Sequence, residues 1–294
     1  MTYILIRTII KKTEEKDVYQ KYYRKYNIAI KRKTSGFSFF FEKDKMTTGK
    51  IQKGIIKKLQ KCSQDMYLIE IEADASFVSK PGQFISIYCE RTLRRPFSIY
   101  SQNGNTISVL FREKGKGTKY LTSLKTGDMV DFSGAFGNGF DIKNKKAILI
   151  GAGVGVAPVF YLKKELEKRG IESLLIAGFR SEDDIPSCVK CDFITTDDGS
   201  NGIKSNVIDF ALSKSEEFNP EIIYSCGPEI VLKKSSELAD KLNIESQVAM
   251  EKVMACSIGV CRGCVIDIIK DGKIQNASVC KDGPIFNGRE VVWK

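Results

Sequence analysis

The sequence has no histidine among its 294 residues, and no apolar run approaches the roughly 20 residues that a membrane-spanning helix needs. The missing histidines exclude a Rieske centre, which takes two imidazole ligands. The chain starts with an apolar patch, but no positively charged region precedes it and no small-residue cleavage site follows it. It therefore does not resemble a signal peptide. These absences predict a cytoplasmic protein that does not span a membrane.

The positive charge is unevenly distributed. The net charge is +11, and residues 1–45 hold 12 of the 47 Lys and Arg but only 5 of the 36 Asp and Glu. A nucleic-acid-binding protein carries its basic residues on a folded face or in a recognisable module. Here they lie in a leader without sustained periodicity, so we expect no nucleic-acid partner. The segment MTTGKIQ, from Met46, resembles a second start, and we expect residues 1–45 to be poorly structured or the product of a misassigned start codon.

Nine cysteines are present. A reducing cytosol does not favour a disulfide framework, so another explanation is needed. Five cysteines are scattered along the chain, and we expect most of them to be small core residues: Cys62, Cys89, Cys188, Cys191 and Cys226. Cys188 and Cys191 form a C-x2-C pair, but no second pair at the spacing of a zinc site accompanies it.

Changes in hydrophobic pattern divide the rest of the chain into three segments. Residues 46–143 contain short β-runs separated by turns such as QNGN and KTGD, which predicts an antiparallel β-barrel. Residues 144–243 alternate apolar strands with helices, the pattern of a doubly wound α/β domain. Residues 244–294 hold the remaining cysteines and two β-runs around Asp271-Gly272, which is a hairpin signal. The predicted fold class is α+β, with several domains.

The last four cysteines have the spacing C-x4-C-x2-C-x15-C: Cys256, Cys261, Cys264 and Cys280. This is the arrangement of plant-type [2Fe–2S] ligands. Glycines in the loop allow backbone N–H groups to turn toward the sulfur atoms, and the predicted hairpin returns Cys280 to the other three. A structural zinc site usually has two C-x2–4-C knuckles, so it fits less well, and unligated thiols are a third possibility.

Two loops in the α/β segment have the context of nucleotide-binding turns. LIGAGVGVAPV (149–159) follows a predicted strand and opens a helix, and its Gly151, Gly153 and Gly155 let a pyrophosphate approach the backbone. SCGPE (225–229) also joins a strand to a helix, with Cys226 and Gly227 before Pro228 at a helix start. Both loops should meet at the carboxyl ends of parallel strands. The alternative is that both are purely structural turns.

The barrel segment carries a further motif, RRPFSIYS (94–101). Arg95 is suited to bidentate pairing with a phosphate, and Phe97 and Ser98 are suited to contact a flat ring. Alone, this segment would be an edge strand with a proline. FREKGKGTKYL (111–121) adds a Gly-x-Gly-Thr turn before a short helix, which is a second suitable phosphate cradle.

Together, RRPFSI, GAGVGVAP and CGPE resemble the ferredoxin-reductase superfamily, which joins an FAD-binding barrel to an NAD(P)-binding domain. With MACSIGVCRGC and VCKDGPIF included, the chain from about residue 47 is similar to the electron-transfer subunits of type B dihydroorotate dehydrogenases. The resemblance implies FAD, a [2Fe–2S] cluster and NAD as cofactors, and it places Cys226 beside the nicotinamide as the catalytic residue. It implies that FAD is contacted by Arg95, Pro96, Phe97, Ser98, Leu110, Phe111, Arg112, Gly117 and Thr118. Ser257, where relatives often have glycine, and the leader depart from the family.

The resemblance also implies a function. No convincing substrate-binding constellation is evident, so the oxidation of dihydroorotate should belong to a partner, an FMN-containing subunit in a heterotetramer of two plus two chains. This chain would pass electrons from that partner through the cluster and FAD to NAD⁺, in pyrimidine biosynthesis. We expect the loop 257–263 to dock on the partner.

Two points stay open at this stage. In GFRSEDDI (178–185), Glu182 or Asp183 would favour the free ribose hydroxyl of NAD, whereas Arg180 could pair with the 2′-phosphate of NADP. The alternative functions are a small flavin and iron–sulfur subunit of another NAD(P)H–ferredoxin, sulfite reductase or hydrogenase-type complex, or a zinc-stapled binding protein.

Overall fold

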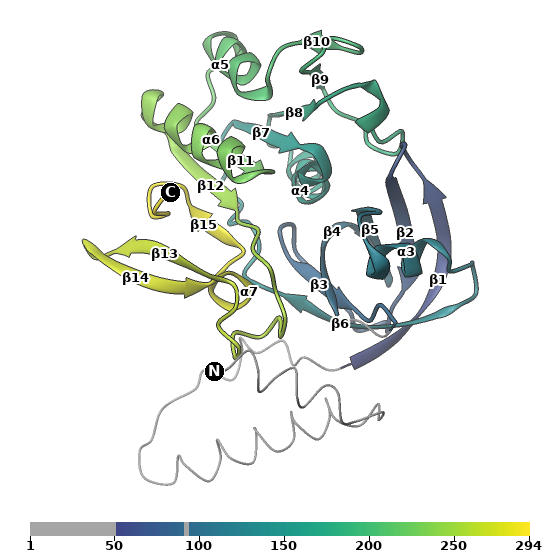
Figure 1. Cartoon of the computed structure of the whole chain (residues 1–294). Helices are drawn as coiled ribbons and strands as arrows, with labels where there is room; N and C mark the ends of the chain where they lie inside the picture. The colour runs from purple at the N-terminus through teal and green to yellow at the C-terminus, as the bar shows by residue number, and fades with distance from the viewer. Residues whose placement is uncertain (1–50, 91–93) are drawn as a thin grey trace, which may run out of the picture. The chain divides into compact units, whose positions relative to one another are not determined.

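The computed structural model describes residues 51–90 and 94–294 (Figure 1). The leader expected at residues 1–45 lies outside the described residues. Within the described part, no helix combines the length and the apolar character that crossing a bilayer demands.

Six antiparallel strands close into a barrel in the order β1-β2-β5-β4-β3-β6. The strands are β1 (Ile51–Lys61), β2 (Met66–Glu72), β3 (Phe84–Ile87), β4 (Arg95–Asn103), β5 (Thr106–Arg112) and β6 (Met129–Phe136). Helix α3 (Lys116–Thr122) follows β5. Alternating apolar residues such as Ile69, Ile71 and Val109 fill the interior. The barrel and its helix confirm the prediction from the turn-punctuated β-runs.

A seven-stranded sheet follows, in the order β10-β9-β8-β7-β11-β12-β15. Its strands are β7 (Ala147–Ala152), β8 (Ser173–Phe179), β9 (Phe193–Thr196), β10 (Ile203–Lys204), β11 (Ile222–Cys226), β12 (Glu245–Ala249) and β15 (Ile285–Asn287). All pairings are parallel except that of β15 with β12. The strand order reverses between β7 and β11, where open α/β sheets bind their ligands.

Helices cover both faces of this sheet, as the doubly wound prediction requires. The helical segments are η1 (Gly153–Gly155), α4 (Val156–Lys168), η2 (Glu182–Asp184), α5 (Val207–Phe218) and α6 (Glu229–Lys241). Apolar residues of α4 share a core with the sheet and with Tyr100 and Leu110 of the barrel. Residues of α5 and α6 pack in a separate core against the strands. Helix α4 therefore lies between the sheet and the barrel, in contact with β4.

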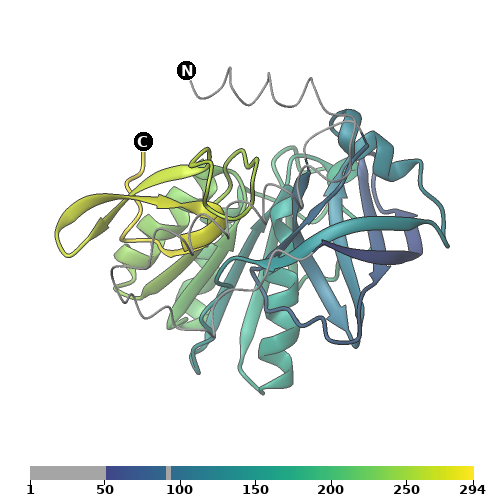
Figure 2. The same ribbon diagram turned by 90° about the horizontal axis from the view of Figure 1, so that it is seen from below.

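The C-terminal segment is a hairpin with a short helix, yellow to yellow-green in Figures 1 and 2. Strands β13 (Val265–Lys270) and β14 (Lys273–Ser278) pair antiparallel, and α7 (Val279–Asp282) follows. Asp271 and Gly272 both have positive φ, +52° and +70°, the conformation of a tight hairpin turn. The hairpin predicted around these two residues is confirmed.

The sheet extends beyond residue 243, where we expected the α/β domain to end. Strand β12 continues the parallel sheet next to β11, and β15 adds an antiparallel edge strand from within the cysteine-rich segment. A third core joins this segment to the sheet and to the barrel, with Phe84 and Phe136 of the barrel packed together with Val248, Cys264 and Cys280. The cysteine-rich segment is thus anchored on both neighbouring modules.

Candidate functional site

The four spaced cysteines lie together at the base of the C-terminal hairpin. Cys264 directly precedes β13 and Cys280 follows β14, and the hairpin register brings the chain back so that Val279 N–H donates to the Cys264 carbonyl at 3.0 Å. Cys256 and Cys261 lie on the loop before β13. The long C-x15-C interval therefore holds one complete hairpin.

Backbone amides point at the sulfur atoms. The N–H groups of Cys261 and Cys280 donate to Sγ of Cys256 and Cys264, each at 3.4 Å, and Gly259 N–H donates to Cys280 Sγ at 3.1 Å. Such bonds favour the thiolate over the thiol. The hydrogen bond with the Cys280 thiol is the main cause that lowers the pKa of Cys256 to about 4, and the same contact raises the pKa of Cys280.

These residues fit an iron–sulfur cluster. Soft thiolates surrounded by amide donors are the ligand set that such clusters use. Among the described residues, no three His, Cys, Asp or Glu side chains converge on a position for a single ion. The four thiols instead form a connected group, in which Cys256 contacts Cys280 and Cys261, and Cys280 also contacts Cys264. Four cysteines are the ligand set of a [2Fe–2S] cluster.

Ser257 links the cysteine loop to the barrel. Its φ is +59°, in the left-handed region that glycine adopts most readily, and its side chain is buried. Its hydroxyl donates to the Ser86 hydroxyl of β3 at 3.4 Å. Ser86 in turn pairs with Pro96 of β4, inside the predicted FAD motif. The departure at Ser257 thus provides a polar contact between the cysteine loop and the barrel.

The two predicted nucleotide loops meet at the carboxyl end of the sheet. Strands β7 and β11 are in a register that aligns Gly151 with Cys226. A Cβ atom on Gly155 would lie 2.5 Å from the Cys226 carbonyl oxygen, so only glycine fits there. No side chain caps the N-terminus of α4, and Pro228 is the N-cap of α6. Backbone N–H groups at both helix starts are suited to a pyrophosphate.

Cys226 itself is partly buried at this junction. Burial is the main cause that raises its pKa to about 12. Its side chain is therefore a neutral thiol at physiological pH, and a neutral group suits contact with an uncharged part of a ring. Gly227 lies against Ala152, whose Cβ atom would be 2.8 Å from a Cβ at residue 227.

The RRPFS motif forms the start of β4, and its two arginines differ in their surroundings. Arg94 donates to the Ser86 carbonyl at 3.0 Å and to the Ser133 hydroxyl at 3.4 Å, so it is bound within the barrel. For Arg95, no hydrogen bond or ion pair links its guanidinium to the residues that the structure describes. Arg95, Pro96, Phe97 and Ser98 are all partly exposed. The structure separates the two arginines, which the sequence could not.

The other residues predicted to contact FAD lie on β5 and α3. Leu110 and Phe111 are buried, with the Phe111 ring 5.6 Å from that of Phe97. Gly117 is buried in the first turn of α3. The Thr118 hydroxyl accepts the N–H groups of Lys114 and Gly115 at 2.9 and 3.1 Å, which orders the turn before the helix.

Arg112 connects the barrel to the sheet. Its guanidinium pairs with Asp184 of η2 at 2.6 Å and with Asp65 at 3.2 Å. The sequence did not predict the role of Asp65 and Asp184, because Arg112 is distant from both of them along the chain. In the same segment Glu182 accepts a hydrogen bond from Asn201 at 3.2 Å, and Glu182, Asp183 and Arg180 are all exposed.

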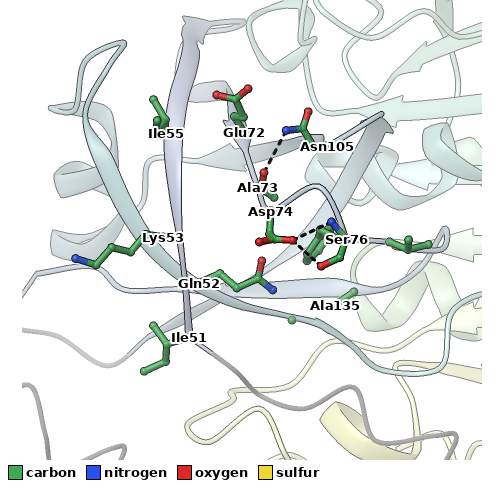
Figure 3. A pocket seen from close by; sticks show the side chains of 13 residues that line it. Ile51, Gln52, Lys53, Ile55, Glu72, Ala73, Asp74, Ser76, Asn105 and Ala135 are labelled. Atoms are coloured by element: carbon green, nitrogen blue, oxygen red, sulfur yellow. Dashed lines mark hydrogen bonds between the residues drawn. The ribbon is translucent and has the colours of Figure 1, made fainter.

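A separate cavity of about 590 Å³ opens beside β1 and the segment after β2 (Figure 3). None of the residues predicted to bind a cofactor lines it. Ser76 donates to Asp74 from its N–H at 2.9 Å and from its hydroxyl at 2.6 Å, and Asn105 donates to the Ala73 carbonyl at 3.2 Å. These polar groups stabilise the turn itself, and we assign no chemistry to the cavity.

Comparisons with known proteins agree with this geometry. The family model for the iron–sulfur cluster binding domain of dihydroorotate dehydrogenase B matches residues 251–292. A model for an FAD-binding domain matches residues 51–146. These ranges coincide with the cysteine-rich segment and with the barrel.

Curated relatives match over most of the chain. The protein of Clostridium acetobutylicum named dihydroorotate dehydrogenase B (NAD(+)), electron transfer subunit, is 36% identical over 259 residues, which cover 85% of this chain and 98% of that protein. The protein of the same name from Listeria innocua is 38% identical over 72% of this chain and 87% of its own length.

A solved structure is similar as well. The structure of the NADH-dependent reduced ferredoxin-NADP oxidoreductase, described for flavin-based electron bifurcation, has a chain with a TM-score of 0.71 and 27% identity. It covers 84% of this chain and 92% of its own. The fold, the placement of the cysteines and the matches over nearly the full length of curated relatives lead to one assignment: the chain belongs to the family of electron transfer subunits of dihydroorotate dehydrogenase B (NAD(+)).

Proposed function

We propose that this chain carries electrons from a dihydroorotate-oxidising partner subunit to NAD⁺, by way of a [2Fe–2S] cluster and FAD. The observation that carries the proposal is the convergence of three modules. The cysteine loop contacts β3 of the barrel through Ser257, and the glycine loop meets Cys226 in the sheet. A cluster, a flavin and a nicotinamide bound by these residues would be neighbours.

Each group of residues has a distinct part in this function. Cys256, Cys261, Cys264 and Cys280 would hold the cluster, with amide donors stabilising the charge on sulfur. Arg95 would bind a flavin phosphate, and Phe97 and Ser98 would contact the ring system. Leu110, Phe111, Arg112, Gly117 and Thr118 complete this site. When bound, the flavin allows one-electron carriers to exchange with a two-electron hydride acceptor.

The sheet would bind the nicotinamide nucleotide. Gly151, Gly153 and Gly155 admit the pyrophosphate to the start of α4, and Gly227 and Pro228 shape the opposite wall. Cys226 would lie beside the nicotinamide as a neutral thiol. Asp183 is the better candidate for the ribose hydroxyl of NAD, because Glu182 is already bound to Asn201.

The partner would contain FMN and bind in a heterotetramer of two plus two chains. The loop 257–263 is the proposed docking surface, because it carries Cys261 between Cys256 and Cys264 and exposes Val260 and Arg262. We further propose a cytoplasmic location, and domains at 46–143, 144–243 and 244–294, with β12 and β15 linking the last two.

One observation favours a second candidate. The similarity to the NADH-dependent ferredoxin-NADP oxidoreductase structure over 84% of the chain is compatible with a subunit of another flavin and iron–sulfur complex. Co-purification from the native cell separates the two candidates. A dihydroorotate dehydrogenase catalytic subunit supports our proposal, and a different large subunit contradicts it.

The proposed electron path predicts a specific result for the substitution Cys261→Ser. Anaerobically purified protein should show flavin bands over a broad cluster absorbance and bleach with NADH. The Cys261→Ser variant should lose the cluster signal and retain FAD, because the ligand lies outside the barrel. It should still reduce artificial acceptors with NADH, while electron transfer to the partner is lost.

Absorbance, iron content and NADH oxidation measure these outcomes. Cys191→Ser is the matched control, since Cys191 lies on the loop before β9 and should change neither signal. Loss of FAD together with the cluster would contradict the assignment of separate binding modules. Absence of iron in the oxygen-protected wild-type protein would contradict the whole proposal.

A further inference from the structure

Two cysteines outside the proposed electron path face each other between the barrel and the sheet. Cys62 lies in the turn between β1 and β2, and its side chain is only 5% exposed. Cys188 lies between η2 and β9 and is partly exposed. Ser187 N–H donates to the Cys62 carbonyl at 2.8 Å, so the two backbones are in direct contact. Figure 1 shows the β1–β2 end of the barrel beside the segment that follows β8.

Further bonds hold these two segments together. The Tyr100 hydroxyl of β4 donates to the Cys188 carbonyl at 2.8 Å, and the Tyr100 ring stacks on Phe160 of α4 at 4.6 Å. Gln64 N–H, two residues beyond Cys62, donates to the Asp183 carbonyl at 3.2 Å. The segments that carry the two thiols are therefore held in register by bonds on both sides.

The two side chains pack in the same core, where the Cys62 thiol donates to the Gln60 carbonyl at 3.7 Å, and each thiol influences the pKa of the other. The hydrogen bond from the Cys188 thiol is the main cause that lowers the pKa of Cys62, with a smaller contribution from Lys58, and the same contact raises the pKa of Cys188. Cys62 is thus the sulfur that carries the negative charge more readily. A thiolate in contact with a second thiol is the arrangement from which a disulfide forms.

We propose that Cys62 and Cys188 are a redox-active pair whose reversible disulfide ties the barrel covalently to the nucleotide-binding sheet. The oxidant is a low-molecular-weight disulfide, RS–SR. The Cys62 thiolate attacks one of its sulfur atoms, which forms a mixed disulfide and releases RS⁻. Cys188 then gives its proton to a released RS⁻ and attacks the Cys62 sulfur, which displaces the second RS⁻. The second RS⁻ takes up from solvent the proton that Cys62 released when it ionised, so in total two protein thiols are oxidised and RS–SR is reduced to two RSH.

Cys191 provides an internal comparison. It packs against the same core as Cys62 and Cys188. Burial and then Asp192 raise its pKa to about 12, with no contribution from the other two thiols. The Cys188 segment is bonded directly to the barrel, through Ser187 to Cys62 and through the Cys188 carbonyl to Tyr100, so the proposed partner of Cys188 is Cys62 and not Cys191.

The test uses the full chain with its cofactors, oxidised under anaerobic conditions with bis(2-hydroxyethyl) disulfide. Remaining thiols are blocked with N-ethylmaleimide, and peptides are mapped without reduction. We expect one linked peptide that joins Cys62 to Cys188 and disappears with dithiothreitol. The Cys191→Ser variant should form the same link. Alkylated, unlinked Cys62 and Cys188, or a link between Cys188 and Cys191, would overturn the proposal. Because the readout is on the wild-type protein, it does not depend on a variant that folds.

A second measurement tests whether the disulfide restrains the barrel and the sheet against unfolding. Unfolding in urea can be monitored by the release of FAD. The unfolding equilibrium constant should be about 30- to 900-fold lower for the oxidised protein than for the reduced protein, which is the range that typical native disulfides give. The Cys62→Ser variant treated with the same oxidant should show no such difference. Identical midpoints for oxidised and reduced wild type would mean that the bond does not restrain the two modules, which would contradict the inference.

Discussion

At the scale of single residues, side chains of the same type differ in their bonds and burial. Arg94 is bound to the Ser86 carbonyl inside the barrel, whereas Arg95 is partly exposed and is the arginine that we propose for a flavin phosphate. Cys226 is held neutral by burial, whereas Cys256 is held as a thiolate by hydrogen bonds. Local bonds and burial, and not residue type, distinguish these side chains.

The neutral state of Cys226 makes a prediction about pH. Its pKa is raised to about 12 by burial, so in the folded protein the thiol stays protonated from pH 7 to pH 9. In the unfolded chain an ordinary cysteine titrates at about 8.5. Modification of Cys226 by iodoacetamide should stay slow and nearly constant over this range in the folded protein, and rise steeply in urea. Mass spectrometry of the labelled peptide measures both rates.

The difference between the pKa of Cys226 in the folded and unfolded protein also determines how the free energy of unfolding changes with pH. The unfolded thiol releases its proton above about pH 8.5 and the folded one does not, so Cys226 makes unfolding easier as the pH rises past 9. The Cys226→Ala variant should lose this part of the pH dependence. A labelling rate in the folded protein that rises through pH 8.5 would contradict the assignment of a buried, neutral thiol.

Ser257 makes a prediction about the cysteine loop. Its left-handed backbone costs about 1–2 kcal/mol relative to glycine, and the contact with Ser86 contributes about 0.5–1.5 kcal/mol. The two effects nearly cancel in Ser257→Gly, so this variant should retain its cluster. Ser257→Ala loses only the hydroxyl, and Ser257→Val adds a β-branched side chain to a strained, buried position. The rate at which a chelator removes iron should be lowest for Ser257→Gly, higher for Ser257→Ala and highest for Ser257→Val. Equal rates would show that the position does not restrain the loop.

At the scale of elements, β15 is the link on which the C-terminal segment depends. Phe286 pairs with Val248 of β12 and packs in the core that includes Cys264 and Cys280. Its side chain is 7% exposed. A three-residue strand thus closes both the sheet edge and the core behind the cysteines.

Removing the Phe286 ring should therefore affect stability and the cluster together. Phe286→Ala should lower the free energy of unfolding by about 3–5 kcal/mol, the usual cost of emptying a buried aromatic site. The iron content after purification should also fall. Ile274→Ala is the control, since Ile274 is 69% exposed on β14 and should cost less than about 0.5 kcal/mol. Urea unfolding and iron analysis measure these effects. Full iron retention in Phe286→Ala would argue that the shared core is not needed to hold the cluster.

Much of the fold could be predicted at this scale, and the omissions have a physical reason. The barrel strands and the α/β alternation have strong local patterns, and Asp271-Gly272 marks the hairpin. By contrast, Ile285–Asn287 is too short to have a pattern, so its pairing with β12 was not predicted. The bonds of Arg112 to Asp65 and Asp184 also depend on tertiary structure, which sequence spacing does not show.

At the scale of the whole molecule, hydrophobic cores are shared between modules, which would bring the proposed cofactor sites close to one another. One core includes Tyr100 and Leu110 of the barrel together with α4 and the sheet. Another joins Phe84 and Phe136 of the barrel to Cys264 and Cys280. Electron transfer in this family would therefore not require the modules to find one another by diffusion.

The proposed docking surface makes a prediction at this scale. Val260 is 43% exposed between Gly259 and Cys261, and a charge at this position would be buried unpaired against a partner. Val260→Asp should weaken binding of the catalytic subunit about 10- to 100-fold and leave the absorbance of the isolated chain unchanged. Val78→Asp is the control, because Val78 is 74% exposed beside the barrel cavity. Calorimetry or co-purification would measure the affinity. Unchanged binding by Val260→Asp would place the partner elsewhere.

The core that packs behind the cysteines also determines when the cluster can be inserted during synthesis of the chain. Met254, Cys264, Cys280 and Phe286 pack with Val291, whereas the barrel side of the same core is contributed by Phe84, far earlier in the chain. The ribosome must therefore pass residue 291 before the pocket for iron can close around its ligands. Cluster insertion should follow translation of this segment.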